Sequence, residues 1–275
     1  MTIASEIQRI NNNIASAYTA CNSKGATMPV TQNSANLATC IGSITAGGSS
    51  IGIPREVSSG GVYQVSSSVA SFNLPSNATD VSSYALNRAY NGCTSITSAD
   101  LSSLTTISGT YALASVFEGC TNLATVDLSS LTTISGPNAL TNAFLGCFSL
   151  TSVNLSSLTT ISGSSSLASA FESNQNYTSL ITSITFSSLS TLTGSSAFQF
   201  CFRYREGLQS ISFPALTSTS FGTRTNQFNS MLTSVTGCTV HFPSNLQSVI
   251  GSWTSVVNGF GGTNTTILFD LTATT

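Results

Sequence analysis

Hydrophobic and polar residues recur along the chain with a period of 27 residues. An earlier, degenerate copy of the pattern begins near Val69. Repetition at a fixed period of about 20–50 residues is typical of solenoids, in which each unit stacks on the next. The three clearest units follow one another without a gap at 93–119, 120–146 and 147–173.

The unit 120–146 indicates which elements one repeat builds. Val126 and Leu128 alternate with polar neighbours, which is the period-two pattern of a half-buried strand. The chain then turns at Gly136, and the apolar residues after it have the spacing of a short helix: Leu140, Ala143 and Phe144. We therefore expect a strand, a turn and a short helix per unit, and an α/β solenoid as the fold class.

Breaks in the repeat pattern predict four regions. Residues 1–45 are expected to form a helical attachment or oligomerisation segment, and 46–68 a Gly/Ser-rich linker with an N-terminal cap. The repeat array is expected over 69–245, with an insertion of four residues after Ser173. Residues 246–275 carry an apolar helical face followed by a strand-like segment, so they are expected to cap the last coil.

Composition narrows the classes of partner. Only 6% of residues are charged, against about 25% in average soluble proteins, and the formal net charge is -2. Nucleic acids and anionic lipids require clustered lysine and arginine, so neither is expected as a partner. The first twenty residues contain no apolar signal-peptide core, and no run of about eighteen apolar residues predicts membrane insertion.

The cysteines follow the same period as the apolar residues. Cys93, Cys120 and Cys147 are spaced by 27 residues, and Cys201 follows 54 residues later. A small thiol at one position of each unit is typical of a core residue, so these cysteines are expected to be buried and reduced. With one histidine, His241, and no CxxC motif, neither a metal nor another cofactor is expected.

The repeats resemble the BspA-like class of leucine-rich repeats. The unit CTNLATVDLSSLTTISGPNALTNAFLG carries the C-x-x-L start, the later L-x-x-I-x-G and the A-F closure of that class. The resemblance covers roughly residues 69–250 and implies a leucine-rich-repeat solenoid. It departs from the family in a Ser-Ser pair after the strand and in the aromatic, arginine-bearing segment 198–205.

The amino-terminal region carries two further patterns. Its isoleucines alternate at spacings of four and three, which favours a short parallel coiled coil, plausibly a homotrimer, and equally fits one amphipathic helix docked on another surface: Ile3, Ile7, Ile10 and Ile14. The stretch KGATMPVTQNSANLATCIGSI resembles the amino-terminal segment of bacteriophage tail and baseplate-associated proteins. That resemblance implies attachment to other virion structural proteins.

Two candidate sites follow from the repeat. Outward strand positions place polar residues one coil apart, about 4.8 Å, at Asp100, Asp127, Asn154 and Thr185. Two carboxylates at that spacing suit retaining glycoside hydrolysis or a calcium ion, and repetition alone also explains them as a solvated face. The second candidate is the segment whose residue types are enriched in binding hot spots: Phe200, Phe202, Arg203, Tyr204 and Arg205.

These patterns favour a non-enzymatic virion component. It would be made in the host cytoplasm, attach to the virion by its N-terminus, and present the repeat surface to a host cell-surface glycan or protein. One alternative is a bacterial surface adhesin with BspA-like repeats. The other is a glycan-active hydrolase that uses Asp100 and Asp127.

Overall fold

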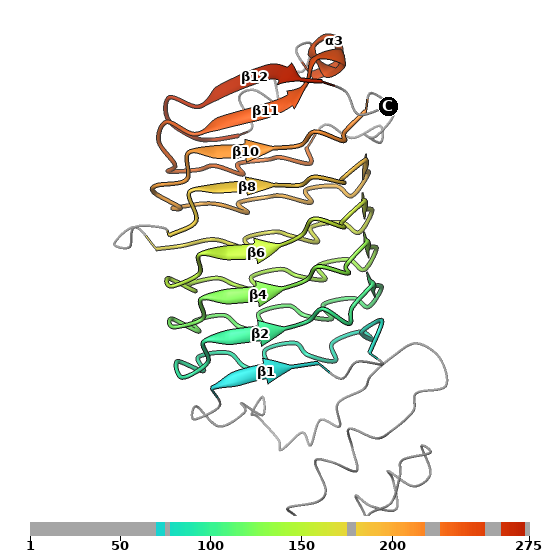
Figure 1. Cartoon of the computed structure of the whole chain (residues 1–275), viewed down its shortest axis with the longest axis vertical. Coiled ribbons are helices and arrows are strands. Elements are labelled where there is room, and N and C mark those ends of the chain that lie inside the picture. Colours follow the sequence, from blue (N-terminus) through green and yellow to red (C-terminus); the bar gives the residue numbers. More distant parts are fainter. Residues whose placement is uncertain (1–69, 75–77, 175–179, 218–225, 251–259, 273–275) are drawn as a thin grey trace, which may run out of the picture. The chain divides into compact units, whose positions relative to one another are not determined.

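The computed structural model describes residues 70–74, 78–174, 180–217, 226–250 and 260–272. The chain divides into two units, Met1–Ser50 and Ile51–Thr275. All described residues belong to the second unit, a parallel β-solenoid in which similar coils stack along one axis (Figure 1). The isoleucine seam and the segment that resembles bacteriophage proteins both lie outside the described residues.

The strands form three parallel sheets. The first two follow one side of the stack and share the strand positions of the repeat. The first contains β1 (Ser71–Asn73), β2 (Ser98–Asp100), β4 (Thr125–Asp127) and β6 (Ser152–Asn154). The second contains β8 (Ser183–Thr185), β10 (Ser210–Ser212), β11 (Thr239–Pro243) and β12 (Thr266–Leu271). The third contains β3 (Thr106–Ile107), β5 (Thr133–Ile134), β7 (Thr160–Ile161) and β9 (Thr191–Leu192).

The 27-residue period sets the pairing register. Val126 of β4 pairs with Ala99 of β2 and with Val153 of β6, so equivalent residues lie side by side. Val126 is 3% exposed, whereas its neighbour Thr125 points to solvent. Because side chains alternate across a strand, a register shift of one residue would expose the apolar column. The predicted solenoid and its inward strand positions are confirmed.

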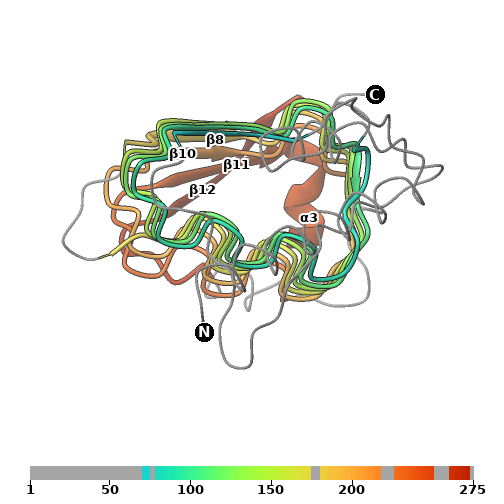
Figure 2. The same ribbon diagram turned by 90° about the horizontal axis from the view of Figure 1, so that it is seen from below.

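The segments that follow the third sheet are not helices, so the predicted strand, turn and short helix per unit is wrong in its last part. Leu113 N–H donates to the carbonyl of Ala139 in the next coil at 2.8 Å, and Ala114 N–H donates to Tyr111 within its own coil. Successive N–H groups alternate in this way, whereas an α-helix directs every N–H to its own chain. Viewed along the stack, these segments undulate opposite the straight strands (Figure 2).

Helix among the described residues is confined to the carboxy-terminal end, in η1 (Ser244–Leu246) and α3 (Gln247–Ile250). The helical face predicted from 246 to 260 continues beyond α3 into residues 251–259, which lie outside the described part. The predicted final strand is confirmed as β12, which pairs in parallel with β11. No helix of the described residues has the length and apolar character needed to cross a bilayer.

A column of aromatic rings fills the core behind the turn segments. The rings of Phe117 and Phe144 are stacked with centroids 6.0 Å apart, Phe144 and Phe171 are 5.3 Å apart, and Phe171 and Phe202 are 5.5 Å apart. All four side chains are fully buried. Burial of each ring contributes about 1.5–3 kcal/mol, so the column is a principal source of cohesion between coils.

The cysteines form a second buried column, as the sequence predicted. Cys93, Cys120, Cys147 and Cys201 are at most 1% exposed, and the described cysteines form no disulfide. The thiol of Cys120 donates to the carbonyl of Tyr90 at 3.0 Å. Burial raises the pKa of the Cys120 thiol to about 12. These thiols are therefore protonated core groups.

Candidate functional site

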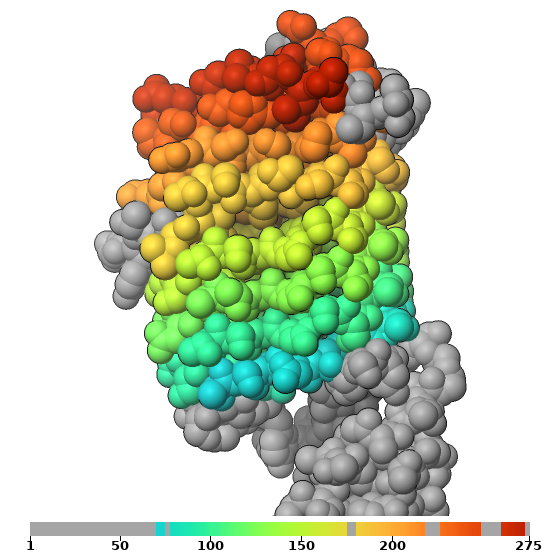
Figure 3. Space-filling view, in the orientation of Figure 1, coloured from blue at the N-terminus to red at the C-terminus, as the bar shows by residue number. Residues whose placement is uncertain are grey.

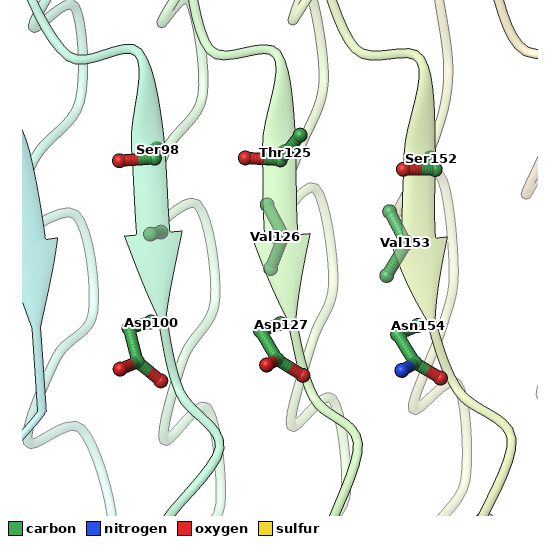
Figure 4. A pocket seen from close by; sticks show the side chains of 9 residues that line it. Ser98, Asp100, Thr125, Val126, Asp127, Ser152, Val153 and Asn154 are labelled. Atoms are coloured by element: carbon green, nitrogen blue, oxygen red, sulfur yellow. The ribbon is translucent and has the colours of Figure 1, made fainter.

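The outward strand face carries the predicted polar column. Asp100 pairs in register with Asp127, and Asp127 with Asn154, so the three side chains project side by side from β2, β4 and β6 (Figure 4). Together with their strand neighbours they line an open depression. Asn73 of β1 extends the column by one coil, which the degenerate first repeat made difficult to assign. Figure 3 shows this side as one continuous surface of stacked coils.

Each residue of this column closes the turn that follows its strand. Asp100 Oδ1 accepts hydrogen bonds from the N–H and the hydroxyl of Ser102, at 2.9 and 2.6 Å. Asp127 Oδ1 accepts from Ser129 N–H at 2.8 Å, and Asn154 uses its Oδ1 in the same way. Asp and Asn favour turns because their side-chain oxygen reaches the backbone two residues on. The column therefore has a structural cause in every repeat.

These hydrogen bonds also decide the electrostatics of the column. The hydroxyl and then the backbone N–H of Ser102 lower the pKa of the exposed Asp100 carboxyl, because both bonds favour its charged form. The described residues include no group of three histidine, cysteine or acidic side chains able to hold a metal ion. The column presents hydrogen-bond acceptors in a regular row.

The second sheet continues the outward face with different chemistry. Thr185 of β8 pairs with Ser212 of β10, which pairs with His241 of β11. His241 Nδ1 lies 2.9 Å from a carboxylate oxygen of Asp270, on the neighbouring strand β12. This contact joins the last two strands of the array. Neutral hydroxyls therefore separate the Asp/Asn column from one histidine-carboxylate pair.

The structure divides the aromatic segment into buried and surface residues. Phe202 belongs to the buried aromatic column, and Arg205 is 1% exposed. Arg205 Nε donates to the carbonyl of Phe171, and burial lowers the pKa of its guanidinium to about 10. Neither residue reaches the surface, so the prediction that they contact a partner is corrected. In this segment Phe202 occupies the position of Phe171 one coil earlier.

The remaining three residues of the segment form a surface cluster. The guanidinium carbon of Arg203 lies 4.7 Å from the ring centroid of Phe200 and 5.2 Å from that of Tyr204. Arg203 Nε also donates to Glu172 Oε1 at 2.9 Å. Glu172 was not predicted, although it stands directly after Phe171 of the preceding unit, as Arg203 stands after Phe202.

A depression adjoins this cluster at the ends of the turn segments. Its lining combines carboxylates, an amide, apolar side chains and exposed backbone. The residues that line it are Glu118, Gly119, Leu145, Gly146, Phe148, Glu172, Ser173, Asn174 and Tyr204. Five come from the equivalent ends of three successive coils, so the sequence period also builds this feature.

The model of the BspA type leucine rich repeat region matches the chain in six copies, over residues 49–168 and 88–252. The chain belongs to the BspA-type leucine-rich repeat family. No curated protein sequence matches this BspA-type chain. The family match begins at residue 49, so it does not reach the segment that resembles bacteriophage proteins.

Two solved structures have low similarity to this BspA-type protein. A leucine-rich repeat protein from Bacteroides ovatus is 16% identical over 72% of this chain and 69% of its own, with a TM-score of 0.15. A leucine rich cell surface protein from Faecalibacterium prausnitzii is 15% identical over 82% of this chain and 89% of its own, also with a TM-score of 0.15. At these TM-scores neither supports an argument about function.

Proposed function

We propose that this BspA-type protein is a non-enzymatic adhesin that presents its outward strand face to a polar partner, such as a glycan, at a bacterial surface. The in-register polar column of β1, β2, β4 and β6 carries the proposal. Acceptors and hydroxyls that repeat once per coil suit a partner with repeated hydrogen-bonding groups. A surface with few charges favours recognition through many weak contacts.

The chemistry of the column argues against a hydrolase. Retaining glycoside hydrolysis needs one carboxyl group with a raised pKa, which donates a proton to the leaving group. Asp100 has a lowered pKa, and Asp127 Oδ1 is engaged by the backbone of its own turn. These groups are stabilised as charged or structural acceptors. Their arrangement therefore supports binding over acid catalysis.

A virion component remains a second candidate. It is favoured by the sequence of residues 24–44, which resembles bacteriophage tail and baseplate-associated segments. In that setting the repeat array would perform the same recognition, with the amino-terminal segment joining it to virion proteins. Genes for tail and lysis proteins beside this gene would favour the virion, and a free-standing surface locus would favour the adhesin.

The proposal is tested by blocking the centre of the strand face. Thr125 is exposed in the middle of the first sheet, so Thr125→Arg places a bulky cation there. Ser135→Arg is the matched control, because Ser135 is exposed just after β5 of the third sheet. Labelled full-length proteins are applied to arrayed bacterial polysaccharides and to bacterial cells. We expect Thr125→Arg to bind at least tenfold more weakly than the control, and equal binding would contradict the proposal.

A further inference from the structure

We propose that the depression between Glu118 and Tyr204 is a separate binding site for one pyranose ring of a neutral saccharide. It lies at the ends of the turn segments, whereas the face proposed above lies on the strands. The proposal therefore adds a site of defined ligand chemistry to the general recognition function. Its test uses residues that do not belong to the strand face.

Backbone hydrogen bonds place the lining residues in register. Gly119 N–H donates to the carbonyl of Leu145 at 2.8 Å, and Gly146 N–H to that of Glu172 at 3.0 Å. Glu118, Leu145 and Glu172 therefore hold the same position on three successive coils. The two carboxylates are separated by two coil spacings, about 10 Å, which leaves room for one sugar ring above Leu145.

Glu172 is prepared to accept a hydrogen bond from a ligand. Its side chain is only 9% exposed, and its Oε1 accepts from Arg203 at both Nε and Nη2. Its second oxygen, Oε2, accepts no hydrogen bond from the residues that the structure describes. An acceptor held in a largely buried position without a partner is costly, so a ligand hydroxyl that reaches Oε2 gains a well-oriented bond.

Aromatic and apolar groups complete the site. Phe148 and Tyr204 line the depression, and each is half-buried. The guanidinium of Arg203, 5.2 Å from the ring centroid of Tyr204, helps to hold that ring in place. The face of an aromatic ring is electron-rich and attracts the weakly positive C–H groups of a sugar. Carboxylates that accept hydroxyls beside an aromatic face form a lining complementary to a pyranose.

The charge balance favours a neutral ligand over a cationic one. Arg203 neutralises Glu172 directly, so Glu118 is the one carboxylate of the lining without an ion pair among the described residues. Recognition of an organic cation relies on aromatic faces and uncompensated negative charge. Here a guanidinium already lies over Phe200 and Tyr204. A ligand that offers hydroxyls and an apolar face therefore fits this lining better than an ammonium group.

The test is saturation-transfer NMR on the full chain. The probes are the methyl pyranosides of glucose, galactose, mannose and N-acetylglucosamine, with tetramethylammonium as the cationic comparison. We expect at least one pyranoside to bind in the millimolar range, and tetramethylammonium not to bind. Leu145→Trp fills the depression without removing its polar groups, and we expect it to weaken pyranoside binding at least tenfold.

Two further variants complete the design. Tyr204→Ala should weaken pyranoside binding about tenfold, and Tyr111→Ala, which alters a tyrosine stacked on Tyr84 elsewhere on the turn segments, should not. Thermal unfolding verifies that each variant is folded. The proposal is overturned if no pyranoside binds, if tetramethylammonium binds instead, or if Leu145→Trp binds sugar as the native chain does. Surface binding that persists without pyranoside binding would leave the strand-face function intact.

Discussion

At the scale of single residues, hydrogen bonds within one coil set the properties of the polar column. Ser102 lowers the pKa of Asp100, so this carboxylate stabilises the fold above its unfolded pKa of about 3.9 and loses that effect as pH falls through the lower folded value. Ser102→Ala removes the hydroxyl donor and should raise the pKa of Asp100. A carboxyl carbon NMR titration measures this directly. An unchanged pKa would show that the hydroxyl is not a significant partner.

The buried thiols allow a second test at this scale. Burial raises the pKa of Cys120 and of Cys238 to about 12, and the thiolate is the form that reacts with alkylating agents. In the native protein at pH 8 we expect both to be alkylated at least a hundredfold more slowly than in denaturant. Peptide mapping by mass spectrometry resolves each cysteine. Rapid native labelling of Cys120 would contradict its assignment to the core.

Residue type and period predicted the Asp/Asn column but not the burial of Arg205. A strand alternates its side chains regularly, so the outward register of Asp100 followed from one repeat to the next. The segment that contains Arg205 departs from the repeat, and an arginine is ordinarily expected at the surface. Its burial depends on the carbonyl of Phe171 in the preceding coil, a contact that no local pattern encodes.

At the scale of elements, the period predicted the strands correctly and the turn segments wrongly. Apolar spacings of three and four residues around Leu140 fit a helix, yet alternate N–H groups there bond to the next coil. The signal that distinguishes the two structures is the residue at every fourth position. Asn138, Asn142 and Gly146 all have positive φ, and Asn and Gly adopt that conformation most readily.

Close approach of coils makes one glycine column sensitive to substitution. A Cβ on Gly136 would lie 2.2 Å from the carbonyl oxygen of Gly109, whereas a Cβ on Gly237 would meet nothing within 4 Å. We expect Gly136→Ala to lower the free energy of unfolding by more than about 3 kcal/mol. Gly237→Ala, with φ of +73°, should cost only about 1–2 kcal/mol of backbone strain. Denaturant unfolding compares them, and equal losses would contradict the packing of the coils.

At the scale of the whole molecule, the repeat array is expected to fold independently of the amino-terminal segment. Its core consists of contacts between successive coils, as in the Phe117, Phe144 and Phe171 column. The isoleucine seam predicts that residues 1–44 mediate assembly. Deletion of residues 1–50 should therefore reduce the mass measured by light scattering to that of a monomer while circular dichroism is retained. An unchanged oligomeric state would refute the role of the seam.

The central claim is that the array recognises a partner without cleaving it. It is tested most directly by incubating a bacterial polysaccharide that binds the full chain with the native protein and with an Asp100→Asn, Asp127→Asn variant. Asparagine retains the Oδ1 acceptor that closes each turn, so the variant should keep its fold. We expect both proteins to bind and neither to release reducing ends. Reducing ends produced by the native protein and absent with the variant would contradict this function and establish a glycoside hydrolase.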